Sequence, residues 1–137
     1  MTVRETIEAQ CSRSIGTMLR RRVQLTPSRP AYLHPDERNA WVTLTWGQIG
    51  EITEQVAGGL LAAGVGYEQR VAIASNTRVE WVLACYGSNL MGAATTSIYP
   101  NTTDDDVAYI LADSGSVVAF VEDAAQVAKI TDHSELD

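Results

Sequence analysis

The 137-residue sequence predicts an α/β fold, a partial doubly wound parallel sheet with flanking helices and an N-terminal β-hairpin. Three short runs, at residues 71–74, 94–99 and 117–121, predict strands, and helical patterns separate them. The first and third runs are apolar at every position, which is typical of parallel strands covered on both faces. We therefore expect one parallel sheet with helices on both faces. Because a three-stranded sheet is small, we also expect part of its cover to be missing.

The first thirty residues divide into a flexible N-terminus at 1–12 and a basic amphipathic helix with its linker at 13–30. The apolar side of this helix holds Ile15, Met18, Leu19 and Val23. Three arginines lie largely on the polar side, namely Arg20, Arg21 and Arg22. We expect the apolar side to dock on the rest of the chain. A weak peripheral contact with an anionic membrane is the alternative, because basic amphipathic helices bind such surfaces.

Residues 31–131 are expected to form the α/β subdomain. It begins with a hairpin of two short strands, at 31–34 and 40–44, around a polar loop. His34 lies at the rim of this hairpin without a histidine or cysteine near it in the sequence. We therefore interpret it as a loop residue rather than a metal ligand.

The longest helix is predicted over 46–63. Thr45 and Gln48 have the spacing of a capping box at its start, and Gly64 ends it. The predicted buried stripe consists of Ile49, Ile52, Val56, Leu60 and Ala63. The pair Gly58–Gly59 costs about 1 kcal/mol per glycine against alanine inside a helix. This cost indicates that the helix packs closely on the sheet at that point.

A second helix is predicted over 78–91, between the first two parallel strands. Thr77 and Glu80 have capping-box spacing, and Gly92 is expected to stop the helix. Its predicted apolar face consists of Val79, Val82, Leu83, Tyr86, Leu90 and Met91.

A third helix is predicted over 104–112 and starts with three successive aspartates. Successive side chains point in different directions, so chelation of a metal ion is a poor explanation for them. We expect Thr102 or Thr103 to cap this helix, with the acids in its first turn, where they favour the helix dipole. Asp123 is expected to cap a last helix, and 132–137 is expected to be a polar tail.

A ligand site is expected at the carboxyl ends of the parallel strands, because open α/β sheets bind ligands there. In this chain those ends are Ser75–Asn76, Tyr99–Thr102 and Glu122–Asp123. The candidate ligand-binding residues are Asn76, Tyr99, Asn101 and Thr102. The alternative is turn chemistry alone, in which Pro100 ends a strand and the polar residues cap the next helix. No catalytic constellation, glycine-rich phosphate loop or zinc spacing can be read from the sequence.

Charge and hydropathy limit the remaining function classes. The formal net charge is -7, which argues against general nucleic-acid binding. No apolar run is long enough for a transmembrane helix, and the N-terminus lacks the apolar region of a signal peptide. The two cysteines, Cys11 and Cys85, are far apart, which is consistent with free thiols in a cytoplasmic protein.

The order of several short motifs between Ile15 and Glu122 resembles the start of the adenylate-forming, or AMP-binding, enzymes. The long-chain fatty acyl-CoA synthetases are the branch that it resembles most. The motifs are Thr43-Leu44-Thr45-Trp46-Gly47-Gln48-Ile49, Gly59-Leu60-Leu61-Ala62-Ala63-Gly64-Val65, Arg70-Val71-Ala72-Ile73, Met91-Gly92-Ala93-Ala94, Ser97-Ile98-Tyr99-Pro100-Asn101 and Tyr109-Ile110-Leu111-Ala112-Asp113-Ser114. The chain departs from the family pattern at Glu68-Gln69, where Gly-Asp usually precedes Arg70.

The resemblance implies an enzyme that activates a fatty acid with ATP and Mg²⁺ and transfers the acyl group to CoA. The family's phosphate-binding loop, ribose-binding acid and lysine-bearing C-terminal domain all lie downstream of the part matched here. The resemblance thus implies that residues 31–131 are an incomplete AMP-binding domain. We therefore expect an N-terminal fragment that is inactive alone and binds no cofactor by itself. One alternative is a small stand-alone nucleotide- or CoA-binding module.

A third hypothesis is a structural piece that associates with itself or with a missing C-terminal portion of the enzyme. It follows from the apolar strand at 117–121, whose bare edge or face would be an association site.

Overall fold

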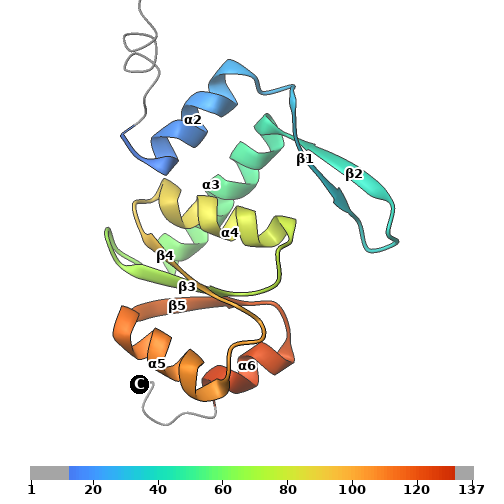
Figure 1. Ribbon diagram of the computed structural model, residues 1–137. Coiled ribbons are helices and arrows are strands. Elements are labelled where there is room, and N and C mark those ends of the chain that lie inside the picture. The colour runs from blue at the N-terminus through green and yellow to red at the C-terminus, as the bar shows by residue number, and fades with distance from the viewer. Residues whose placement is uncertain (1–12, 132–137) are drawn as a thin grey trace, which may run out of the picture.

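The computed structural model describes residues 13–131, so the predicted flexible segment 1–12, the tail 132–137 and Cys11 lie outside it. These residues form three layers, with α2, α3 and α4 above a sheet and α5 and α6 below it (Figure 1). The helices are α2 (Ile15–Leu25), α3 (Trp46–Ala62), α4 (Val79–Leu90), α5 (Asp104–Ser114) and α6 (Ala124–Thr131). The strands are β1 (Pro30–Pro35), β2 (Trp41–Thr45), β3 (Arg70–Ala74), β4 (Ala94–Ile98) and β5 (Ser116–Val121).

The central sheet has the order β4-β3-β5. Both of its pairings are parallel, which confirms the prediction of one parallel sheet. The middle strand, β3, is buried at four of its five positions. In the pairing of β3 with β5 the register shifts after Ser116, so Val117 is an extra residue opposite the start of β3. This bulge leaves Val117 51% exposed at the outer edge of the sheet.

Each face of the sheet has its own apolar core. On one face, Val71 packs in a cluster with Leu60 of α3, and Val118 and Phe120 of β5 contact the same cluster. The other cluster joins β3 and β4 to α5 and α6 and consists of Ala72, Ala74, Ile98, Val107 and Leu111 with Ile110, Ala119, Val121 and Ile130 packed against it. Helices of the chain itself therefore cover both faces, although no residue of β5 is fully buried.

Helices α3 and α4 pack against each other through small residues. The predicted stripe of α3 is buried at Ile49 and Leu60, but Ala63 is exposed, and Thr53 and Ala57 are buried instead. On α4 the fully buried positions are Ala84, Gly87 and Ser88, whereas the residues of the predicted apolar face are only partly buried. Hydropathy favoured the large side chains, but it is the small ones that let two helix backbones approach.

The prediction that Gly58–Gly59 packs closely on the sheet is wrong. Both glycines are exposed, and a Cβ atom added at either one would meet nothing within 4 Å. The close contacts lie at other glycines of the helices. A Cβ on Gly87 would lie 2.6 Å from Cβ of Val56, and one on Gly50 would lie 2.9 Å from Cγ1 of Val23.

Helix α2 docks on the rest of the chain, as predicted, but only part of its predicted apolar side is buried. Gly16 and Leu19 are buried, but Ile15 and Met18 are 46% and 48% exposed. A Cβ on Gly16 would lie 2.6 Å from the carbonyl oxygen of Asn89, so α2 and α4 touch backbone to backbone there.

Two further contacts tie the N-terminal elements to the helices. The guanidinium of Arg22 lies 5.2 Å from the ring centroid of Trp46, which is a cation–π contact. The hairpin of β1 and β2 is antiparallel, as predicted, and projects from the body beside α3 (Figure 1). The hydroxyl groups of Tyr32 and Tyr86 lie 3.3 Å apart, and burial followed by this hydrogen bond raises the pKa of Tyr32 to about 12.

Most predicted helix ends are confirmed. Thr45 and Gln48 form a capping box on α3, Thr103 accepts a hydrogen bond from the Asp106 amide, and Asp123 accepts one from the Gln126 amide. Gly92 follows α4 with a φ of +88°, a conformation in which a side chain would be strained and would also collide with Tyr67.

The predicted capping box of Thr77 and Glu80 is wrong. Helix α4 begins at Val79, its N-cap is Arg78, and no side chain caps it. Within residues 13–131 no helix has the length and apolarity needed to cross a membrane.

Candidate functional site

The carboxyl ends of β3 and β4 border a cleft of about 710 Å³. The residues that line it are Ser75, Asn76, Thr77, Trp81, Ser97, Ile98, Tyr99, Pro100 and Asn101. One wall comes from the segment between β3 and α4, and the other from the end of β4 and the turn that follows it. The cleft therefore lies where the topology of an open α/β sheet places a ligand.

Three of the four predicted candidates line this cleft, namely Asn76, Tyr99 and Asn101. Tyr99 is 77% exposed, so its ring offers a stacking surface rather than a buried anchor. Thr102 does not line the cleft, and its carbonyl oxygen accepts a hydrogen bond from Lys129 instead. Trp81, which the sequence analysis did not select, adds a second aromatic side chain to the lining.

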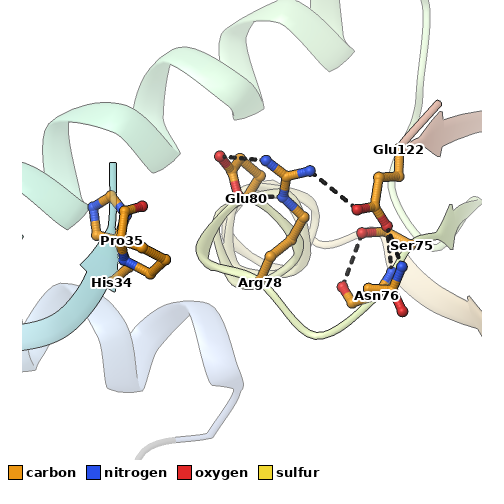
Figure 2. A network of polar contacts seen from close by, with 7 residues as sticks. All are labelled: His34, Pro35, Ser75, Asn76, Arg78, Glu80 and Glu122. Carbon is orange, nitrogen blue, oxygen red and sulfur yellow. Dashed lines mark hydrogen bonds and ion pairs between the residues drawn. The ribbon is translucent and has the colours of Figure 1, made fainter. Parts of the chain in front are cut away.

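Beside the cleft, a network of polar contacts ties the ends of β3 and β5 together (Figure 2). Glu122 accepts hydrogen bonds from the backbone amide and the side-chain amide of Asn76, at 2.7 and 3.0 Å. The guanidinium of Arg78 lies between Glu122 and Glu80, at 3.1 and 2.7 Å (Figure 2). Glu80 therefore pairs with the side chain of Arg78 rather than with the backbone of Thr77, as the predicted capping box would require.

The network shifts the pKa values of all three charged groups. The pKa of Glu122 is lowered chiefly by the hydrogen bond from the Asn76 backbone amide, with Arg78 adding to the effect. The pKa of Glu80 is lowered chiefly by its hydrogen bond from Arg78, and the pKa of Arg78 is raised by the same pairing. Both carboxylates are thus held ionised, and both already have a cationic partner.

A second cleft, of about 870 Å³, lies between the hairpin and the start of α4. Its lining includes Trp41 and His34 from the hairpin and Arg78, Glu80 and Glu122 from the network. Nδ1 of His34 lies 3.0 Å from the carbonyl oxygen of Pro35, its own neighbour in sequence. In the part of the chain that the structure describes, no group of three histidine, cysteine or acidic residues is placed to hold a metal ion.

The turn after β4 is held by side chains from α6, which the sequence analysis did not foresee. Nζ of Lys129 donates to the carbonyl oxygens of Pro100 and Thr102, at 2.8 and 2.7 Å. Nε2 of Gln126 donates to the Pro100 carbonyl as well, at 3.0 Å. Gln126 and Lys129 are three residues apart and therefore lie on the same side of α6. This spacing can be read from the sequence, but the position of that side next to Pro100 cannot.

The chemistry available at this edge is positioning rather than bond-making. Its carboxylates are paired with Arg78, and among residues 13–131 no nucleophile is hydrogen-bonded to a general base at the cleft. Nucleotide phosphates with Mg²⁺ need free cations, amide donors or carboxylates. The cleft offers amide donors, from Asn76 and Asn101, but its lining has no lysine, arginine or acidic residue, so the described residues supply no charged group for such phosphates and their Mg²⁺.

A family model described as AMP-binding enzyme matches residues 19–137 of this chain. The long-chain-fatty-acid–CoA ligase heimdall of Drosophila melanogaster is 37% identical over 92 residues, which are 67% of this chain and 14% of that protein. The long-chain-fatty-acid–CoA ligase FadD13 of Mycobacterium tuberculosis is 33% identical over 108 residues, which are 79% of this chain and 21% of that protein. The chain thus spans about a fifth or less of these relatives' length.

Solved structures show the same similarity. A crystal structure of the N-terminal domain of FACL13 from Mycobacterium tuberculosis superposes with a TM-score of 0.78 at 29% identity, covering 90% of this chain and 31% of that one. A Mycobacterium tuberculosis fatty acyl CoA synthetase also gives a TM-score of 0.78, at 30% identity, over 88% of this chain and 24% of that one.

Proposed function

This chain belongs to the AMP-binding enzyme family, and from that premise we propose that it is the N-terminal segment of an ATP-dependent fatty acyl-CoA synthetase. The observation that carries the proposal is the similarity to a solved N-terminal domain of FACL13 over 90% of this chain. The complete enzyme would form an acyl-adenylate from a fatty acid and ATP with Mg²⁺ and then pass the acyl group to CoA. Cytoplasmic localisation and a role in fatty acid metabolism belong to the same proposal.

In this proposal the segment is a scaffold that presents one edge of a parallel sheet. The network of Asn76, Arg78 and Glu122 holds two strand ends at fixed spacing, and the 710 Å³ cleft lies beside it. Groups that stabilise charge at the reacting phosphoryl and acyl centres supply most of the rate in such reactions. The cleft offers no such cluster from the described residues, so the remainder of the enzyme has to provide it.

The test of the proposal is carboxylate-dependent ATP–pyrophosphate exchange by the purified chain. We expect no exchange above the blank with any fatty acid. Exchange that rises with the concentration of the chain and requires a fatty acid would refute a scaffold role.

A stand-alone nucleotide- or CoA-binding module is the second candidate, and the cleft at the carboxyl edge favours it. Titration calorimetry with ATP–Mg²⁺ and with CoA separates the two proposals. The scaffold predicts no saturable heat with either probe, whereas saturable binding that Asn101→Ala weakens would favour the module.

A weak peripheral membrane contact through α2 is proposed in addition. Ile15, Met18 and Leu25 are exposed on this helix, and the charged side chains of Arg20 and Arg22 are exposed as well. Three apolar anchors give little binding free energy on their own, so the contact should depend on anionic lipid. Co-sedimentation with phosphatidylglycerol vesicles should exceed that with phosphatidylcholine vesicles, and Met18→Glu should abolish the difference.

A further inference from the structure

Helix α6 sends two side chains to the turn that forms one wall of the 710 Å³ cleft. Lys129 donates to two carbonyl oxygens of the turn, at 2.8 Å to Pro100 and 2.7 Å to Thr102. Gln126 donates to the Pro100 oxygen at 3.0 Å, so this carbonyl receives two donors. Residues 99–102 and α6 are thereby joined at three points.

The turn has few bonds of its own. Its internal hydrogen bond runs from the Thr102 amide to the Tyr99 carbonyl, at 3.0 Å. Pro100 has no amide hydrogen, so other elements can hold its backbone by hydrogen bonding only through its carbonyl oxygen. Hydrogen bonds from an ammonium group are shorter and stronger than neutral ones. The donors from α6 therefore decide how firmly the turn is held.

Burial indicates that this contact is built into the fold rather than made at the surface. Gln126 is only 6% exposed, and its Oε1 is the buried side-chain atom without a hydrogen-bond partner among the described residues. An unpaired buried amide oxygen is destabilising, and the hydrogen bond that the other end of Gln126 donates to Pro100 offsets part of that cost. Lys129 is partly buried and is the only lysine in the sequence.

We propose that Gln126 and Lys129 are positioning residues, which clamp residues 99–102 and so set the wall of the cleft formed by Tyr99, Pro100 and Asn101. The proposal goes beyond the scaffold function, because the clamp acts on the cleft whatever ligand the complete enzyme binds there. It also makes α6 part of the site, although the helix contributes no residue to the lining.

Hydrogen exchange of the purified chain, followed by mass spectrometry, tests the clamp without any ligand. Lys129→Met keeps the aliphatic length and removes the donors, whereas Lys129→Arg restores a donor of the same charge. We expect exchange in the peptide 99–103 to rise about tenfold in Lys129→Met and to stay within about threefold of the original in Lys129→Arg. Thr131→Ala is the matched control on α6. It removes the hydrogen bond from the Thr131 hydroxyl to the Val127 carbonyl and should leave the exchange of peptide 99–103 unchanged.

A general loss of stability gives a different pattern, since it would raise exchange in β3 and in the opposite wall, 75–81, as much as in 99–103. If Lys129→Met does not fold, amine-selective acetylation of the folded protein replaces it, because Lys129 is the only lysine in the sequence and the N-terminus is the other primary amine. Gln126→Leu gives an independent reading and should raise exchange at 99–103 by about threefold. Unchanged exchange at 99–103 after loss of either donor, or a rise that is equal in all three peptides, would overturn the proposal.

Discussion

The same substitution, glycine to alanine, should have opposite effects at two helical positions. Alanine at Gly87 places its Cβ 2.6 Å from Cβ of Val56 and 3.2 Å from the carbonyl oxygen of Thr53, both on α3. The helices would have to separate, and overpacking of this kind costs about 1–3 kcal/mol. The gain in helix propensity of about 1 kcal/mol offsets part of that cost. Net destabilisation of up to about 2 kcal/mol is therefore expected for Gly87→Ala.

Alanine at Gly58 meets nothing within 4 Å and lies on an exposed part of α3. Only the propensity term remains, so Gly58→Ala should stabilise the protein by about 0.5–1 kcal/mol. Urea unfolding followed by circular dichroism measures both variants, and the midpoints should move in opposite directions at equal slope. If Gly87→Ala were as stable as Gly58→Ala, the close contact of α3 with α4 would be wrong.

Three further outcomes follow from the sheet edge and its network. Because the pKa of Glu122 is lowered in the folded state, its contribution to stability is complete above the unfolded pKa and is lost as the pH falls through the lower folded pKa. Glu122→Gln should therefore make unfolding less dependent on pH below about pH 4.5, and an unchanged pH profile would contradict the contact with Asn76. Arg78→Ala should cost less than about 1 kcal/mol in thermal unfolding, because the Arg78 side chain is 44% exposed and salt screens such pairs, whereas a larger loss would mean a buried role. Self-association through the edge strand β5 is tested by light scattering of the chain and of Val117→Lys, because Val117 is exposed whereas Val118 contacts the core. A protein that stays monomeric at every concentration, with or without the substitution, would show that this edge is not a contact site.

The parallel direction of the three strands could be predicted because the signals are local. Continuous apolar runs such as 71–74, separated by helices, allow few arrangements other than a parallel sheet. Helix caps between residues close in sequence, such as Thr45 and Gln48, could be predicted equally well. The cap predicted at Thr77 was wrong, and the neighbouring Asn76 is instead bonded to Glu122, 46 residues away in the sequence, which no local pattern indicates.

The packing between elements could not be predicted, because it depends on which surfaces meet. Glycines give no hydropathy signal, so Gly58–Gly59 looked like a contact and Gly87 did not. In the candidate site, too, the features set by topology could be predicted and the contacts between distant elements could not. The strand ends that carry Asn76 and Tyr99 were foreseen from topology. The clamp from Lys129 depends on where α6 lies in space and has no counterpart in the local sequence.

The central claim, that this chain serves as the N-terminal segment of a fatty acyl-CoA synthetase, is tested most directly by a chimera. Residues 19–131 would replace the matching segment of FadD13 from Mycobacterium tuberculosis, which is 33% identical over 108 residues. The measurement is palmitate-dependent ATP–pyrophosphate exchange, compared with the same ligase lacking the segment. We expect a soluble chimera whose exchange clearly exceeds that of the truncated ligase. A soluble, folded chimera with no more exchange than the truncated ligase would contradict it.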